Sequence, residues 1–327
     1  MKNFKLLIFD LFFVVSSIIG VGFATGKEIA HFFLSGRSLF WAVVIFFFVF
    51  VGLTWYIMHV KSKHNLNELT NLNKFAFGKY YEIGNIILVI LFIVTNAAML
   101  AGCDNLVGNY LCINLPIVSL FLSGITFFIA LSGVDKIKAI ANVVMPVLIV
   151  IIAVNACCNL KTPTLQGSAV KDIAYPIIFC AENFITLIAV LINTKSKPVT
   201  LSLLSGLTIS LVILISAIAI GNLRVDMPML TLSKNIGVVF FSVYLIGVIF
   251  ALFTTLQIST YNCLQVINKN PKQRIFTLIL ILFISQIIAY LGFNFIVQYL
   301  YSAIGVLGAI YLIVLVVNLV IASNIRK

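Results

Sequence analysis

The first apolar stretch of the chain, residues 4–34, is too long for one plain membrane span and is interrupted in its middle. Gly20, Gly22, Thr25 and Gly26 fall where a spanning helix would lie deepest in lipid. About 20 residues cross a bilayer core as a helix, and glycine weakens a helix interior by roughly 1 kcal/mol relative to alanine. Unwound backbone at this depth is tolerated only where it lines a protein-enclosed cavity. The sequence therefore predicts a discontinuous span, which is typical of the substrate and ion sites of secondary transporters.

Composition places the chain in the membrane. Hydrophobic residues make up 62% of it and charged residues 9%, against about 25% charged residues in a soluble domain. Apolar segments of spanning length recur along the chain and predict an all-α integral membrane protein with ten transmembrane helices. The segments are residues 4–34, 38–60, 81–104, 114–133, 138–160, 173–193, 198–222, 235–266, 272–292 and 294–323.

The distribution of positive charge predicts the orientation of these helices. When successive loops are assigned to alternate sides, fifteen of the 21 Lys and Arg residues fall on the side of the N-terminus and six on the other. Because positive charge stays cytoplasmic, we expect a multi-pass protein of the plasma (inner) membrane with both termini in the cytoplasm. The same distribution accounts for the net charge of +12 without a nucleic-acid partner. Lys2 and Lys5 precede a run too long for a signal peptide, so we expect an uncleaved first span.

The spans divide evenly between the two halves of the chain. Five lie in residues 1–160 and five in residues 161–327. An odd number of spans in each half makes the second half enter from the opposite side, which predicts two inverted five-helix repeats in one membrane domain. The sixth span is then the counterpart of the interrupted first span. It contains Pro176, Glu182 and Asn183, and we expect it to be broken too and to face the first span near the midplane.

The run from Gly20 to Glu28, followed by His31-Phe-Phe33, resembles the first span of the YkvI-type membrane proteins. That family is grouped with amino-acid permeases in the amino acid–polyamine–organocation superfamily. The resemblance implies the LeuT-type fold, a 5+5 inverted repeat with broken helices 1 and 6 and the substrate between their unwound parts. Lys27 departs from the family pattern, in which a neutral polar residue is more usual.

The resemblance and the polar residues of the spans together predict three sets of site residues. The backbone of the break suits a substrate carboxylate, and a mid-membrane carboxylate suits an ammonium group or a proton. The substrate-binding set is Gly20, Gly22, Phe23, Thr25, Gly26, Asn96, Tyr175, Phe179, Glu182 and Asn183. The coupling and gating set is Asp10, Glu28 and Glu182.

The third set is a sodium site that the resemblance places where the first span meets the eighth. Its oxygen ligands are the Ala251 carbonyl, the hydroxyls of Thr254 and Thr255, and span-one carbonyls near Ser16 and Ile19. Threonine hydroxyls in helices also bond back to their own backbone, so packing remains an alternative for both threonines. The sequence favours Na⁺ narrowly over H⁺ as the coupling ion and indicates no other cofactor.

These observations predict an ion-coupled secondary transporter for a small amino acid or a related metabolite. Its partners are then the small-molecule substrate and the lipid bilayer. The alternatives are a ten-span exporter of the drug/metabolite type, which needs no broken first helix, and a membrane scaffold without transport. The sequence contains no HExxH and no GxSxG motif, and its histidines lie near span ends or in a loop. We therefore do not expect an enzyme.

Overall fold

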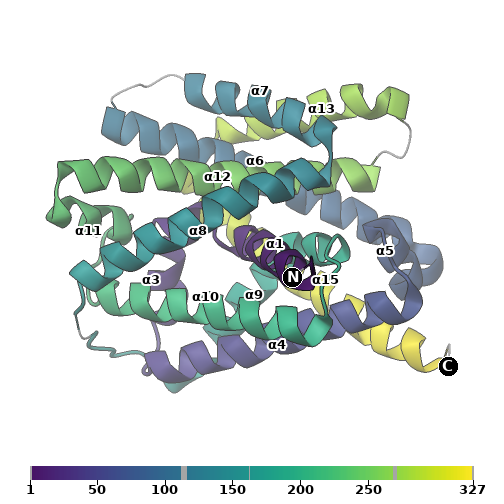
Figure 1. Cartoon of the computed structure of the whole chain (residues 1–327), viewed down its shortest axis with the longest axis horizontal. Helices are drawn as coiled ribbons and strands as arrows, with labels where there is room; N and C mark the ends of the chain where they lie inside the picture. Colours follow the sequence, from purple (N-terminus) through teal and green to yellow (C-terminus); the bar gives the residue numbers. More distant parts are fainter. Residues whose placement is uncertain (1, 112–115, 162, 268–270, 326–327) are drawn as a thin grey trace. The chain divides into compact units, whose positions relative to one another are not determined.

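The computed structural model describes residues 2–111, 116–161, 163–267 and 271–325, and within these ranges the regular structure is entirely helical (Figure 1). The helices are α1 (Lys2–Ile18), α2 (Val21–Ala24), α3 (Lys27–Phe33), α4 (Leu39–His64), α5 (Leu69–Phe77), α6 (Tyr81–Leu111), α7 (Ile117–Ser132), α8 (Val134–Cys158), α9 (Ala169–Ile192), α10 (Pro198–Ile220), α11 (Pro228–Ile236), α12 (Val238–Ile267), α13 (Pro271–Ala289), α14 (Phe293–Phe295) and α15 (Tyr301–Ile325). Short 3₁₀ and π turns precede α6 and α15.

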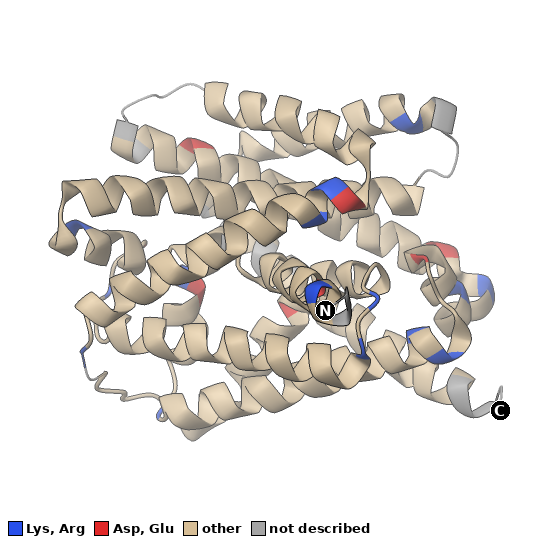
Figure 2. Cartoon of the chain, viewed as in Figure 1, with Lys and Arg blue, Asp and Glu red and all other residues tan. Residues whose placement is uncertain are grey.

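The described residues contain seven helical stretches long and apolar enough to cross a membrane. These lie in α4, α5–α6, α8, α9, α10, α12 and α15, while α7 and part of α13 form shorter apolar helices. Figure 2 shows Lys and Arg mainly near helix ends and in connections, with most of the helical length free of charge. Large apolar side chains such as Phe48, Phe121 and Phe276 are exposed, as lipid-facing helices require. The chain is an all-α membrane protein, and the exact number of ten spans stays a prediction.

The chain forms two compact units, each of which combines segments from both halves of the sequence. The first unit contains residues 1–55, 138–180 and 195–251, and in it α10 packs against α1, α3 and α11. The second unit contains residues 56–137, 181–194 and 252–327, and in it α6 packs against α5, α7, α13 and α15. The predicted repeats, 1–160 and 161–327, do not coincide with these units, and their relation by symmetry stays a prediction.

Candidate functional site

The first apolar stretch is divided into three helices by two short interruptions. α1 ends at Ile18, α2 is a single turn, and α3 begins at Lys27. Gly20 lies in extended backbone before α2, and Gly26 has a φ of 82° before α3. L-residues with a Cβ rarely adopt this left-handed conformation. A Cβ added at Gly26 would also lie 2.7 Å from Met229 Cγ. Glycine therefore permits the second interruption both by its backbone freedom and by its size.

The backbone carbonyls at the second interruption have partners from other elements. The Tyr244 hydroxyl donates to Ala24 O at 2.8 Å, and the Met229 N–H donates to Thr25 O at 3.0 Å. The Asn155 side-chain amide in turn donates to Met229 O at 2.8 Å. The Thr25 hydroxyl, directly after α2, donates to Val21 O at 2.8 Å. Because α8, α11 and α12 supply these partners, the first unit holds the interrupted backbone in a fixed conformation.

Glu28 folds back over the single turn α2. A Cβ added at Gly22 would overlap Glu28 Oε1 and lie 2.6 Å from its Cγ. The carboxylate therefore rests on the backbone of Gly22, and Glu28 is half-buried there. The structure brings these two predicted site residues into contact. An acidic group at an interrupted membrane helix is suited to bind a cation, an ammonium group or a proton.

Phe179 of α9 is the centre of an aromatic cluster that also contains Phe23, Phe32, Phe33 and Phe46. Its ring centroid lies 5.4–6.4 Å from those of the other four rings, and its side chain is fully buried. Such separations are favourable for aromatic pairs. Phe179 thereby packs α9 against α2, α3 and α4. The sequence did not identify Phe46 as part of this cluster, because it stands in a run of phenylalanines that offers no sign of which ring is buried.

Tyr175 lies one turn before Phe179 and contacts α3. Its ring stacks on His31 with a centroid separation of 5.5 Å, and the Lys171 ammonium lies 5.5 Å from the same ring. Lys171 is thus near enough for a cation–π interaction. The predicted site residues Phe23, Tyr175 and Phe179 are therefore brought to one region of the first unit, beside the α2–α3 segment.

The sixth span is not broken as predicted. α9 runs as one helix from Ala169 to Ile192 with Pro176 inside it. Proline removes one N–H donor, but membrane helices accommodate such a loss through neighbouring groups. The segment also lacks the glycines that accompany both interruptions of the first stretch. The prediction of a discontinuous helix at this position was wrong because it depended on proline and polar residues alone.

Glu182 lies in the second unit and packs against α15. A Cβ added at Gly305 would overlap Glu182 Oε1 and lie 2.9 Å from its Cγ. Gly308, one turn later, is similarly close to Ile185. Small residues at these positions let two membrane helices approach closely. Glu182 is half-buried in this contact, and the neighbouring Asn183 is half-buried as well.

Asn96 contacts α12 in the second unit. The Ser259 hydroxyl donates to Asn96 Oδ1 and also contacts Thr255 O at 3.0 Å. Both Asn96 and Ser259 are completely buried. Gln257, on the same helix, was missed in the sequence analysis. It is completely buried, and its amide has no hydrogen-bond partner among the described residues. Buried amides are normally paired, so Gln257 is a further polar candidate on α12.

The residues of the predicted sodium site are divided between the units. Ser16, Ile19 and Ala251 lie in the first unit, and Thr254 and Thr255 lie in the second. All of them are buried. The Ser16 hydroxyl donates to Phe13 O at 2.8 Å, within its own helix. Its carbonyl lies in the last turn of α1. Whether these oxygens converge on one ion stays a prediction.

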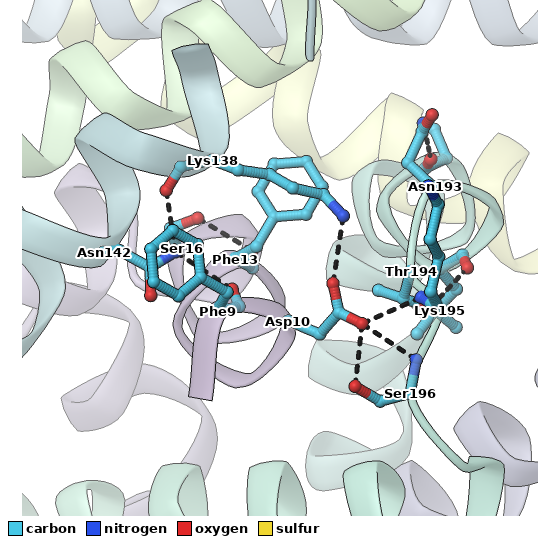
Figure 3. Close-up of polar contacts among 12 residues, drawn as sticks. Phe9, Asp10, Phe13, Ser16, Lys138, Asn142, Asn193, Thr194, Lys195 and Ser196 are labelled. Carbon is cyan, nitrogen blue, oxygen red and sulfur yellow. Dashed lines mark hydrogen bonds and ion pairs between the residues drawn. The ribbon is translucent and has the colours of Figure 1, made fainter. Parts of the chain in front are cut away.

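Asp10 of α1 is completely buried and accepts four hydrogen bonds (Figure 3). The Lys138 ammonium forms an ion pair with it at 2.9 Å. The backbone N–H groups of Lys195 and Ser196 donate to it at 2.8 and 2.9 Å, and the Ser196 hydroxyl donates at 2.8 Å. A buried charge needs this kind of compensation. Asp10 thus joins α1 to α8 and to the connection before α10.

A comparison with curated proteins finds a relative for part of the chain. The chain is 28% identical over 141 residues to the "Uncharacterized membrane protein YkvI" of Bacillus subtilis. The resemblance to the YkvI-type proteins is confirmed. The match covers 42% of this chain and 41% of the YkvI relative, so it spans about two fifths of that protein's length. No family model matches the chain.

Solved structures resemble the chain over almost its whole length. One is a Na⁺-coupled sialic acid symporter in a substrate-bound outward-open state, with a TM-score of 0.65 and 12% identity over 95% of this chain and 78% of that one. Another is a nucleobase-cation-symport-1 family transporter with bromovinylhydantoin bound, with a TM-score of 0.61 and 13% identity over 92% and 74% of the two chains. These similarities show a fold of the LeuT type for this YkvI-like chain.

Proposed function

We propose that the chain is an ion-coupled secondary transporter for a small amino acid or a related metabolite. The observation that carries this proposal is the interrupted α1–α3 segment, with the Glu28 carboxylate resting on Gly22. Structural likeness to Na⁺-coupled symporters supports the reaction class. We further propose ten spans in the plasma membrane with both termini in the cytoplasm, on the basis of the charge distribution.

In this proposal the substrate binds beside the interrupted segment. Its carboxylate meets the backbone around Gly20 and Gly22, because unwound helical backbone offers hydrogen-bond donors to anions. Phe23, Tyr175 and Phe179 supply apolar surface. Asn96, Asn183, Thr25 and Gly26 complete the predicted binding set, and Glu28 and Glu182 take the ammonium group or a coupling proton.

The alternatives explain fewer of the observations. A ten-span exporter of the drug/metabolite type does not require two interruptions with fixed carbonyl partners in its first span. A scaffold would not need a carboxylate at that interruption, because intramembrane charges are costly. The similar solved structures are transporters, which supports a transporter over an enzyme.

Thermal stabilisation of the purified protein tests the proposal. The twenty amino acids and related carboxylates are screened with and without Na⁺, and the stabilising compounds are then tested for uptake into proteoliposomes. A ligand at 100 times its dissociation constant stabilises the folded state by about 2.7 kcal/mol, which raises Tm by several degrees. Absence of any stabilising compound in this set, together with absence of uptake, would contradict the proposal.

The coupling ion is tested at Thr254 and Thr255. If Na⁺ drives transport, Thr254→Val or Thr255→Val removes one oxygen ligand and is expected to raise the Na⁺ concentration for half-maximal uptake about tenfold or more. Thr208→Val is the matched control, because its hydroxyl donates to Leu204 O in its own helix at 2.8 Å. Uptake that is independent of Na⁺ and driven by a pH gradient would show that the two threonines serve only in packing. Coupling would then be assigned to Glu28 or Glu182.

A further inference from the structure

Two buried aspartates of the first unit make the same kind of contact. Asp10, in the middle of α1, accepts hydrogen bonds from the N–H groups of Lys195 and Ser196 just before α10. Asp172, near the start of α9, accepts from the N–H groups of Arg37 and Ser38 just before α4, at 2.8 Å and at 3.0 and 3.1 Å. Asp10 is completely buried and Asp172 is 6% exposed.

The two contacts are reciprocal between the halves of the sequence. Asp10 belongs to the first half and binds a connection of the second, whereas Asp172 belongs to the second half and binds a connection of the first. In each case the first span of one half binds the connection that begins the second span of the other. A two-fold relation between the halves would exchange the two contacts, as expected for inverted repeats.

We propose that Asp10 and Asp172 are equivalent positioning residues that make each first span reorient together with the second span of the other repeat. We call the two contacts the Asp10 link and the Asp172 link. This inference rests on the proposed transport function, and it adds Asp172 to the residues on which transport depends. It also assigns Asp10 a permanent link to α10 in place of a gate.

Burial explains why the links persist during a transport cycle. Buried backbone N–H groups of a connection need a hydrogen-bond acceptor, and a carboxylate supplies one. A buried carboxylate that loses its donors becomes an uncompensated charge in an apolar environment, which is strongly unfavourable. A contact that is so costly to break is not expected to open and close in every transport cycle. Both links are therefore expected to remain formed while the spans move.

The two aspartates differ in the kind of groups that neutralise their charge. Asp10 also pairs with the Lys138 ammonium of α8, whereas the described hydrogen bonds to Asp172 come from backbone N–H groups. Gly36 lies directly against Asp172, and a Cβ added there would overlap Oδ1 and lie 3.0 Å from Cγ. The Gly167 N–H donates to Gly36 O at 2.9 Å. The absence of a side chain at Gly36 thus allows the Asp172 link to form.

Amide hydrogen exchange tests the links without any transport measurement. Asp172→Asn is expected to accelerate exchange at Arg37 and Ser38 but not at Lys195 and Ser196, and Asp10→Asn is expected to show the opposite pattern. Gly36→Ala should reproduce the effect of Asp172→Asn, because it displaces the carboxylate without removing its charge. Unchanged exchange at both connections in all three variants would overturn the inference.

Transport kinetics then separate positioning from general stability. In Asp172→Asn and Gly36→Ala the maximal uptake rate is expected to fall about tenfold, while the substrate dissociation constant changes less than about threefold, because reorientation and not binding is impaired. Arg37→Ala and Lys195→Ala are the matched controls and should keep the wild-type rate, since their backbone N–H groups form the contacts. A loss of uptake rate in Arg37→Ala or Lys195→Ala would show that these side chains, and not their backbone N–H groups, are required for transport. That result would overturn the proposed role of the two links.

Further measurements keep the two proposals distinguishable. Should Asp10→Asn fail to fold, Ser196→Ala removes one donor to Asp10 and is expected to lower the uptake rate in a folded protein. Unimpaired rates in Ser196→Ala, Asp172→Asn and Gly36→Ala would overturn the positioning role even where local exchange increases. If the wild-type protein neither binds nor transports any compound, the proposed function fails, and the exchange pattern still decides whether the links exist.

Discussion

Replacing Gly22 with alanine is expected to reduce uptake by at least about tenfold, because a displacement of about 1 Å in a positioning group can cost about 100-fold in rate. The added Cβ would overlap Glu28 Oε1 and lie 2.4 to 2.6 Å from its Cδ and Cγ. The whole side chain of Glu28 must then move, rather than its tip alone. Initial uptake into proteoliposomes, normalised to folded protein, measures the effect.

Two controls show whether displacement of the carboxylate is the cause. Gly52→Ala, in α4, adds the same methyl group where no described atom lies within 4 Å, so uptake should stay at the wild-type level. The double variant Gly22→Ala with Glu28→Ala removes the overlap and should transport as Glu28→Ala does alone. Wild-type uptake by Gly22→Ala would remove Glu28 and its contact with α2 from the proposed site.

The interruption of the first stretch could be predicted because its cause is local. Gly20, Gly22 and Gly26 weaken the helix at their own positions, and Gly26 adopts a φ of 82°, which residues with a Cβ disfavour. The all-α membrane class could be predicted for the same reason, since the length and composition of an apolar segment are properties of one stretch of chain. Such features need no knowledge of what packs against them.

Contacts between distant segments left no comparable signal. Asp172 binds backbone N–H groups at Arg37 and Ser38, 135 and 134 residues away, and every residue except proline offers such a donor. Gly36 and Gly305 are small because the carboxylates of Asp172 and Glu182 approach them, which the sequence around either glycine does not reveal. The prediction that Pro176 breaks the sixth span was wrong for a related reason, because the surroundings of a helix decide whether proline interrupts it.

Glu182→Gln is expected to abolish gradient-driven accumulation while exchange of substrate continues. A charged side chain at the centre of a membrane helix costs about 2.5 to 3.5 kcal/mol, so the neutral amide should leave Tm unchanged or raise it. The variant keeps the shape of the side chain but cannot bind a proton or neutralise an ammonium group. Substrate accumulation driven by Na⁺ or pH gradients is compared with counterflow exchange in the same proteoliposomes. We expect accumulation to fall more than about tenfold.

A second variant, designed from the contact between Glu182 and α15, tests whether the position of the carboxylate matters as well as its charge. Gly305→Ala retains the carboxylate but displaces it, since a Cβ would lie 2.9 Å from Glu182 Cγ, and it should impair accumulation as well. Glu82→Gln, at the start of α6, and Gly124→Ala, where no described atom lies within 4 Å of the added Cβ, are the matched controls and should accumulate substrate normally. If Glu182→Gln retains full accumulation, the carboxylate serves the packing of α9 on α15, and Glu28 becomes the remaining acidic group for coupling at the interrupted helix.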